Sequence, residues 1–251
     1  MMATHRHIEE ASLNAWPALR QTLYDGWLLR YANGYTKRAN SVNVLYPGSL
    51  GLEEKLRYAG QFYHSQGLPT IFRLTPLAPS ALDETLANLG YPKIDPTDVM
   101  TRRLDDASSL ATPRVGFNDV AVVEASIDDW LDAFCHCQRS ALEHHQTHRC
   151  MLRAILATSF FLYLKVGDEP VACGFGVVDG EYLGLFDFIT HSNFRRRGLA
   201  GRLLHALCMA GRRAGAQRAY LQVVHANEGA RSVYQRAGFQ DTYQYWYRVS
   251  P

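Results

Sequence analysis

The sequence predicts an α/β protein in which mixed β-sheets are flanked by helices, arranged as two related halves. The second half shows the order helix, three strands, helix, strand, helix, strand, and the first half repeats the later part of that order. Gly67 and Gly90, each at the end of a predicted helix, are 23 residues apart. Gly215 and Gly238 have the same spacing and follow the first pair by 148 residues. Self-similarity of this kind is typical of two related domains.

The elements of the second half follow from two patterns. Runs of aromatic and β-branched residues predict strands, and apolar residues that recur at helical spacing predict helices. Asp179-Gly180 between two such runs indicates a tight hairpin. The predicted elements are a helical stretch over 127–159, strands at 160–166, 171–178 and 181–190, a helix that begins near Leu199, a strand at 219–224, a helix that begins after Asn227, and a last strand at 243–249.

The first half shows the same patterns in a shorter form. Its predicted elements are strands at 26–31 and 39–46 joined through Asn33-Gly34, a helix at 52–66, a strand at 69–74, a helix at 80–89 and a last strand at 95–104. The polar, proline-containing segment 105–113 is typical of a linker. We therefore expect domains over 1–110 and 115–251.

Composition excludes several classes of protein. Apolar residues make up 47% and charged residues 20%, which is too apolar for a disordered chain. The net charge of +2 gives no reason to expect a nucleic acid or an anionic membrane as a partner. No apolar run is long enough to span a bilayer, and the segment after Met1 lacks the apolar stretch of a secretory signal. We therefore expect a cytoplasmic protein.

The five cysteines give no evidence for a disulfide framework or a metal site. An odd number, confined to the second half, is typical of reduced thiols used as small apolar residues. Cys135-His136-Cys137 has two ligand types, but no second ligand pair follows at the spacing of a zinc finger. We expect no bound metal.

A phosphate-binding loop is predicted between the third strand of the second half and the helix that follows it. The N-terminus of a helix offers unpaired backbone N–H groups and the positive end of a dipole, which favour an anion. Gly198 allows a ligand to approach the backbone closely, and the arginines add positive charge. Taken alone, three arginines before a helix more often form a solvated basic face. The loop comprises Arg195, Arg196, Arg197, Gly198, Leu199, Ala200 and Gly201.

Two motifs at a fixed separation resemble a known family. Arg195-x-x-Gly198-x-Ala200, which follows the segment 186–190, resembles the acyl-CoA loop of the GNAT superfamily of N-acyltransferases. The segment 227–239, which begins 27 residues after Ala200, is similar to the other half of the core of that family. The resemblance covers about residues 117–251, and the first half resembles the extra N-terminal domain of two-domain members. It implies tandem GNAT-like domains, each a mixed β-sheet flanked by helices.

The resemblance also implies a cofactor and a reaction. Two parallel strands, about 182–190 and 218–224, would splay apart, and acetyl-CoA would enter the V-shaped opening. The reaction would be direct transfer of the acetyl group to a primary amine in a ternary complex. An alternative is a non-catalytic acyl-CoA sensor. The expected acceptor is a small-molecule or peptide amine, and the oligomeric state stays open, with a homodimer as one option. Besides the loop, the expected cofactor contacts are Phe188, Ile189, Thr190 and Asn227.

Two residues are candidates for the proton transfers of this reaction. Tyr234 is the expected general acid, although a tyrosine at this helical position could instead fill the core. Asp187 is the expected general base, but strand alternation could turn its side chain away from the cleft. A bound water could replace a side-chain base, and the weaker candidates are Glu181, His191 and His225. Glu143-His144-His145 with His148 is expected to form a polar helix face.

The first half lacks residues that match the arginine loop and Tyr234. Subtraction of 148 places the uncharged segment 47–52 opposite the arginine loop and Leu86 opposite Tyr234. We therefore expect a degenerate copy of the domain that helps to form the substrate cleft. The candidates for lining that cleft are Trp27, Arg30, Tyr31 and Arg38.

Overall fold

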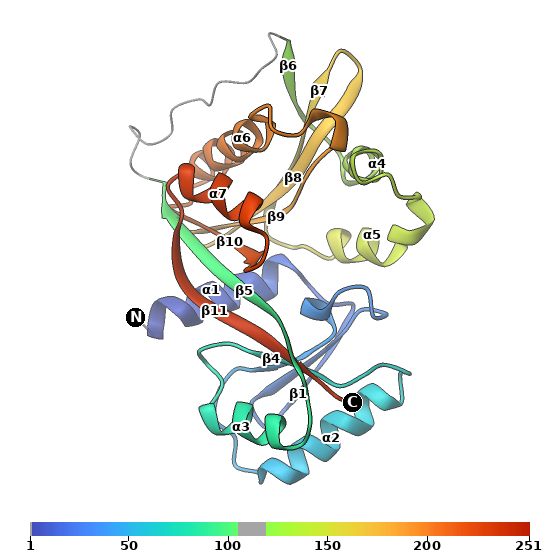
Figure 1. Cartoon of the computed structure of the whole chain (residues 1–251), viewed down its shortest axis with the longest axis vertical. Helices are drawn as coiled ribbons and strands as arrows, with labels where there is room; N and C mark the ends of the chain where they lie inside the picture. Colours follow the sequence, from blue (N-terminus) through green and yellow to red (C-terminus); the bar gives the residue numbers. More distant parts are fainter. Residues whose placement is uncertain (1, 105–118) are drawn as a thin grey trace.

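A single twisted sheet runs through the whole molecule, with helices on both faces (Figure 1). The computed structural model describes residues 2–104 and 119–251. In these ranges the sheet has eleven strands in the order β1-β2-β3-β4-β11-β5-β10-β9-β8-β7-β6. None of the helices described is long and apolar enough to cross a membrane. The predicted linker 105–113 lies outside the described residues, so the domain boundary stays a prediction.

The sequence order of the elements follows the prediction closely. The first half contains α1 (Met2–Ala15), β1 (Arg20–Tyr24), β2 (Trp27–Tyr31), the 3₁₀ turn η1 (Lys37–Ala39), β3 (Val42–Val44), α2 (Leu52–His64), β4 (Ile71–Leu74), α3 (Ser80–Asn88) and β5 (Lys93–Arg103). The second half contains β6 (Val120–Glu124), α4 (Ile127–Gln138), η3 (Leu142–His145), α5 (Gln146–Arg153), β7 (Thr158–Val166), β8 (Glu169–Asp179), β9 (Tyr182–Thr190), η4 (Ser192–Phe194), α6 (Leu199–Arg213), β10 (Arg218–Val224), α7 (Glu228–Arg236) and β11 (Gln240–Val249).

Two local expectations were wrong, and three elements were not predicted. The strand predicted at 39–46 is reduced to β3, because a 3₁₀ turn occupies its start. The helical stretch 127–159 is interrupted at Arg139, whose φ of 60° is left-handed and ends α4. The elements α1, β1 and β6 were not predicted. In α1 and β1 the polar and apolar residues are mixed with too weak a periodicity, and β6 is only five residues long.

The two halves exchange their last strands. The last strand of the first half, β5, pairs with β10 of the second half, from Thr97 opposite Val224 to Arg103 opposite Arg218. The last strand of the second half, β11, pairs with β4 of the first half. Because β5 and β11 also pair with each other, they run side by side through the middle of the molecule (Figure 1). The first and second halves therefore share one sheet.

The helix α1 belongs to the first half in sequence but packs on the sheet of the second. It contacts β8 and β9, and its buried residues Ile8, Ala11 and Ala15 join the same core cluster as Trp130 of α4. The Trp130 ring is fully buried, and its Nε1 donates to the carbonyl oxygens of Leu162 and Gly174, each at 3.1 Å. The opposite face of these strands is covered by α6, whose leucines form a second cluster.

A buried ion pair ties α1 to β4. Both Nη atoms of Arg73 donate to the Glu9 carboxylate, which also accepts from the Tyr243 hydroxyl at 2.5 Å. We expect Glu9→Gln to lower the free energy of unfolding by about 3–5 kcal/mol, because the Arg73 charge stays buried without an anion. The matched control is Asp95→Asn in the exposed pair with Lys37, which should change stability by less than about 1 kcal/mol. Equal losses in chemical denaturation would contradict the assignment.

Candidate active site

An opening between two parallel strands forms the centre of the candidate site. Strands β9 and β10 pair only from Tyr182 opposite Arg218 to Leu185 opposite Leu221, although they continue to Thr190 and Val224. The predicted V-shaped opening is therefore confirmed. Beyond Leu185, no strand of the described ranges 2–104 and 119–251 pairs with β9 on its β10 side, while Ile189 and Thr190 pair with β8 on the other side. An unpaired strand edge offers hydrogen-bonding groups to an extended ligand.

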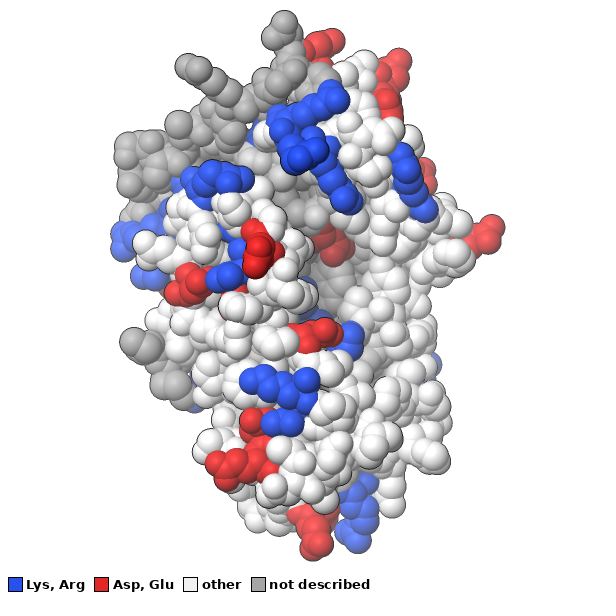
Figure 2. Space-filling view, viewed as in Figure 1, with Lys and Arg blue, Asp and Glu red and all other residues white. Residues whose placement is uncertain are grey.

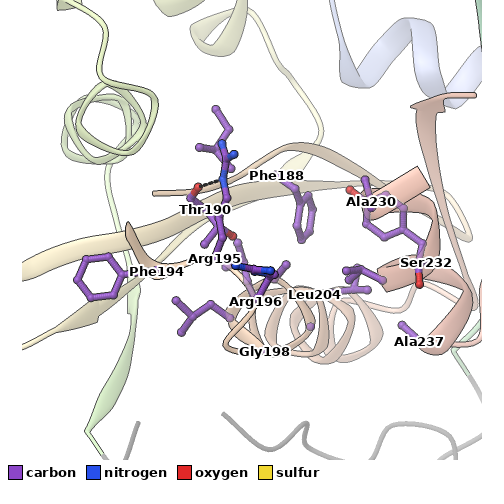
Figure 3. Close-up of a pocket in the computed structure, with 18 of the residues that line it drawn as sticks. Phe188, Thr190, Phe194, Arg195, Arg196, Gly198, Leu204, Ala230, Ser232 and Ala237 are labelled. Carbon is purple, nitrogen blue, oxygen red and sulfur yellow. Dashed lines mark hydrogen bonds between the residues drawn. The ribbon is translucent and has the colours of Figure 1, made fainter. Parts of the chain in front are cut away.

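A cleft of about 1270 Å³ extends from this opening to the N-terminus of α6. Figure 3 shows Phe188 in this cleft, with Thr190 and the arginine loop on one side and Ala230 of α7 on the other. Nearly every predicted cofactor contact lines it. These are Phe188, Ile189, Thr190, Arg195, Arg196, Gly198, Leu199, Ala200, Gly201 and Asn227.

The arginine loop leaves the first amides of α6 without a side-chain cap. Gly198 is the N-cap residue, with a φ of 81°, and it has no side chain that could accept a hydrogen bond. The preceding loop turns at Arg196, whose φ of 60° is also left-handed. The fifteen-residue helix therefore presents unpaired N–H groups and its positive dipole end to the cleft. These properties suit a pyrophosphate.

Two arginines of the loop have different surroundings. The Nε atom of Arg195 donates to the carbonyl oxygen of Thr190 at 3.4 Å and thus joins the loop to the end of β9. Arg197 is not among the residues that line the cleft, and its guanidinium lies 5.8 Å from the centre of the Phe194 ring. A direct contact of Arg197 with the ligand therefore stays a prediction.

Asn227 has the structural role that its position in the sequence suggests. Its Oδ1 accepts a hydrogen bond from the Ala230 amide at 3.1 Å and caps α7. This cap fixes the start of the helix that carries Tyr234, and Asn227 itself also lines the cleft.

Tyr234 lies on α7 and faces the opening. Its ring packs edge-on against Phe188 of β9, with the ring centres 6.2 Å apart, and also contacts Phe239. Burial raises the pKa of Tyr234 to about 12, because the phenolate would lose its hydration. Tyr234 is therefore a protonated hydroxyl, which can donate, at neutral pH.

Asp187 reaches the opposite face of the sheet because of a β-bulge. The register between β8 and β9 shifts at this point. Phe186 and Ile189, three residues apart on β9, pair with Phe175 and Cys173, which are only two residues apart on β8. Asp187 takes a left-handed φ of 51° in the bulge. Strand alternation alone would point it toward α6. The bulge instead turns it toward α5, where its Oδ2 lies 3.0 Å from Nε2 of His148.

The histidines around Asp187 are buried, so the expected polar helix face was wrong for two of its members. His148 is fully buried, and its ring stacks on Tyr35 with the centres 5.2 Å apart. The contact between His148 and Asp187 has the distance but not the angle of a hydrogen bond. Both ring nitrogens of His145 form hydrogen bonds. Its Nδ1 lies 3.1 Å from the Tyr35 hydroxyl, and its Nε2 lies 2.8 Å from the Ser140 hydroxyl.

Comparison with known proteins identifies the family. Residues 2–248 match the family described as "Probable histone acetyltransferase Rv0428c C-terminal". The chain belongs to this family. It is 30% identical over 248 residues to the uncharacterized N-acetyltransferase YobR of Bacillus subtilis, covering 97% of this chain and 98% of YobR. The protein is thus an acetyltransferase of the GNAT type.

Solved structures support the fold of this acetyltransferase. A GCN5-related N-acetyltransferase from Kribbella flavida superposes with a TM-score of 0.74 at 16% identity, covering 98% of this chain and 95% of that one. A tandem GNAT protein from the clavulanic acid biosynthesis pathway superposes with a TM-score of 0.64 at 13% identity, covering 84% and 75%. The predicted tandem arrangement therefore has a structural counterpart.

In the first half, a carboxylate binds the segment that aligns with the arginine loop at an offset of 148 residues. The carboxylate of Asp25 accepts hydrogen bonds from the amides of Ser49 and Leu50, at 2.8 and 3.0 Å, just before α2. Lys55 forms an ion pair with the same carboxylate at 3.0 Å. The hydrogen bonds from these two amides hold the pKa of Asp25 well below its usual range.

Of the four first-half residues expected to line the substrate cleft, two are structural. Trp27 is buried in the core of the first half, with Lys55 over its ring. Arg30 is also buried and donates to the carbonyl oxygens of Trp16, Leu13 and Arg38. A role of Tyr31 in the cleft stays a prediction. Arg38 contacts the second half, where its guanidinium lies 5.9 Å from the centre of the Phe186 ring.

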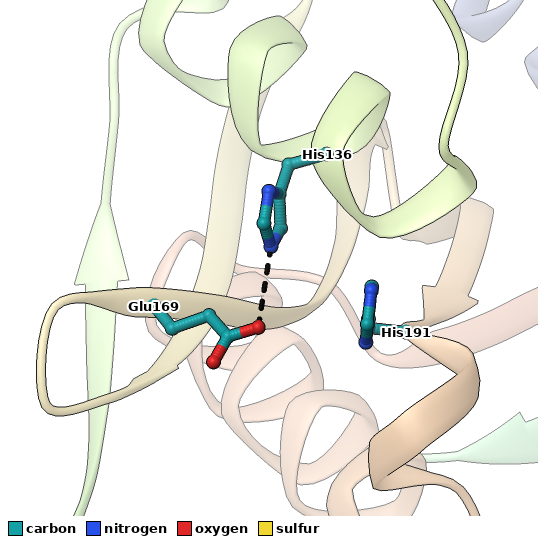
Figure 4. Close-up of side chains that lie close together, drawn as sticks. All are labelled: His136, Glu169 and His191. Atoms are coloured by element: carbon teal, nitrogen blue, oxygen red, sulfur yellow. Dashed lines mark ion pairs between the residues drawn. The ribbon is translucent and has the colours of Figure 1, made fainter.

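The acetyltransferase also brings together three possible metal ligands at the end of α4. The ligand atoms of His136, Glu169 and His191 lie within 4.8 Å of one another (Figure 4). His136 pairs with Glu169 at 3.5 Å, but the Nε of Arg139 donates to His191 at 3.3 Å. A guanidinium beside the third ligand opposes a cation, so we still expect no metal here.

The cysteines are free thiols, and four of the five are buried as the sequence predicts. Cys150 is exposed, so the expected apolar role was wrong for this residue. Burial raises the pKa of Cys208 to about 12, which keeps it an unreactive thiol.

Proposed function

We propose that this acetyltransferase moves an acetyl group from acetyl-CoA to a primary amine by direct attack in a ternary complex. The observation that carries the proposal is the meeting of three features in one cleft. The unpaired edge of β9 fits an extended pantetheine arm, the uncapped N-terminus of α6 fits the pyrophosphate, and Tyr234 faces the opening between them. Bound acetyl-CoA supplies an activated acyl group.

Each proton of the reaction has a proposed destination. The acceptor nitrogen forms a bond to the acetyl carbon while the bond between that carbon and sulfur breaks. Asp187 takes the proton that leaves the nitrogen, and Tyr234 gives a proton to the departing sulfur. A backbone N–H of β9 near Phe188 or Ile189 is the proposed donor that stabilises the charge developing on the carbonyl oxygen. His148, 3.0 Å from Asp187, is a positioning residue.

The other base candidates are less suited to this role. His225 is held by Asp98 at 2.9 Å, and His191 accepts a hydrogen bond from Arg139. Asp187 is the candidate that lies on the strand beside the opening with a side chain that is 24% exposed. The first half is proposed to be the degenerate copy, because Asp25 binds the segment that aligns with the arginine loop.

Two measurements test the proposal together. Isothermal titration of acetyl-CoA measures binding, and thiol release across a panel of amines measures transfer. We expect saturable binding and thiol release that depends on the amine. Binding without thiol release on any amine would favour the acyl-CoA sensor. Failure to bind acetyl-CoA, with nucleic-acid binding instead, would assign the arginine loop to a different partner.

The role of Asp187 gives a separate prediction. Asp187→Asn should lower kcat by about 100-fold near pH 7, because the amide cannot accept the proton. The rate of the variant should recover as pH rises, since more of the acceptor amine is then already neutral. The matched control is Asp168→Asn, at a fully exposed position in the β7–β8 turn. An unchanged rate and pH profile would remove Asp187 from the mechanism.

A further inference from the structure

The guanidinium of Arg38, from the first half, lies at the side of the opening where the acceptor amine is proposed to bind. It has no anionic partner among the described residues. Arg38 lies in η1 and is half-buried. Its guanidinium packs 5.4 Å from the centre of the Trp16 ring and 5.9 Å from that of Phe186. Its Nε is buried without a hydrogen bond. Among residues 2–104 and 119–251, no carboxylate lies within ion-pair distance of Arg38, in contrast to Arg73, which pairs with Glu9.

Arg73 and Arg30 are buried nearby, but the side chains of both have hydrogen-bond partners. Arg73 is paired with Glu9, and Arg30 donates to backbone carbonyl oxygens. A guanidinium that has lost part of its hydration and gained no hydrogen bonds is unfavourable in the free protein. A buried polar group without a partner calls for an explanation, and a ligand that completes its hydrogen bonds is one.

Arg38 and Asp187 face the same region. Phe186, which Arg38 covers, directly precedes Asp187 in β9, and the charge of Asp187 acts on Arg38. Figure 2 shows a hollow in the middle of the molecule, between the two halves, with acidic and basic side chains inside it. The side chain of Asp187 is 24% exposed and Arg38 is half-buried, so both are partly accessible to solvent. The region thus offers one negative and one positive group to a ligand.

We infer that the acceptor is an amine that also carries a carboxylate, of the amino-acid class, and that Arg38 is the residue that binds this carboxylate. The inference rests on the proposed function. A guanidinium matches a carboxylate with two parallel hydrogen bonds. The single positive charge of Arg38, beside the negative charge of Asp187, can neutralise one carboxylate. A phosphate dianion carries two negative charges and would require more positive charge. Binding at Arg38 leaves the amino group of the acceptor near Asp187, which takes its proton.

The test compares acceptors that differ only in the carboxylate. Thiol release from acetyl-CoA is measured with the twenty common L-amino acids and with their decarboxylated amines, such as phenylalanine against phenethylamine and lysine against cadaverine. O-phosphoethanolamine tests a phosphate in place of the carboxylate. We expect kcat/KM to be about 10- to 100-fold higher with the carboxylate. Equal or better turnover of the decarboxylated amines, or of the phosphate, would overturn the inference.

Variants of Arg38 assign the preference to this residue. Arg38→Gln should raise the KM of the amino acid by about 100-fold and leave the dissociation constant of acetyl-CoA unchanged, and Arg38→Lys should restore part of the loss. The matched control is Arg20→Gln on the exposed edge strand β1. A preference that Arg38→Gln leaves intact would also overturn the inference.

A stability measurement separates ligand binding from a structural role. Without acceptor, Arg38→Met should raise Tm, because it removes an unpaired cation from a partly buried site. A fall in Tm would indicate a structural role. Titration of the same amino acids into the wild-type protein with CoA present tests Arg38 even if no amine is acetylated. Binding that Arg38→Gln abolishes would then uphold the carboxylate site and reject only the proposed reaction, and absence of binding would reject both.

Discussion

Gly198→Asp should raise the dissociation constant of acetyl-CoA by about 100-fold. Gly198 has a left-handed φ of 81° at the start of α6, where the pyrophosphate is proposed to lie. A carboxylate there would repel a phosphate about 5 Å away by about 3 kcal/mol at an effective dielectric constant of about 20. It would also accept hydrogen bonds from the amides that the ligand needs. Isothermal titration measures the change.

The control for this variant separates charge from backbone strain. Gly198→Asn adds a side chain of the same size without a charge, and asparagine adopts left-handed φ more readily than most residues. We expect it to weaken binding by less than about 10-fold. If the Asp and Asn variants bind acetyl-CoA equally well, the pyrophosphate does not lie at the N-terminus of α6.

Tyr234→Phe should lower kcat by about 10²–10³-fold and leave acetyl-CoA binding unchanged. The phenylalanine ring can keep the packing against Phe188 and Phe239, so only the hydroxyl is lost. Single-turnover thiol release measures the rate, and Tyr46→Phe at an exposed position of the first half is the matched control. An unchanged rate in Tyr234→Phe would show that solvent or another group protonates the thiolate.

The raised pKa of Tyr234 adds a pH dependence to this prediction. A general acid is active in its protonated form, which is lost as pH rises through its pKa. Because that pKa is about 12, Tyr234 stays protonated throughout the range from pH 6 to pH 10. The kcat of the wild-type enzyme should therefore show no falling limb from Tyr234 in that range. A falling limb near pH 9 that disappears in Tyr234→Phe would contradict the assigned pKa.

Sequence reasoning succeeded where structure depends on local patterns. The arginine loop, the helix that begins at Leu199 and the Asn227 cap were all placed correctly, because glycine, capping residues and helical periodicity act within a few residues. The acyl-CoA side of the candidate site is built almost entirely from such local features. The acceptor side is not, since Arg38 reaches it only through the packing of the two halves.

Two determinants of the site could not be predicted from periodicity. The direction of the Asp187 side chain depends on one extra residue in β9, and an alternating pattern contains no signal for such a bulge. The burial of His148 depends on Trp16 and Tyr35, which lie more than a hundred residues earlier in the chain. Both outcomes result from tertiary packing, which overrides the polar character of the local sequence.

The exchange of β5 and β11 has a consequence for the order in which the chain folds. Val249 pairs with Ile71, 178 residues earlier, so β4 remains an open edge until the ribosome has made almost all the intervening chain. Unpaired edges in nascent proteins are sites of aggregation, and distant pairings slow folding. The first half is therefore complete only after the second half has been synthesised. A protease cut within 105–118 would leave the two fragments associated, because each would retain a strand that the other requires.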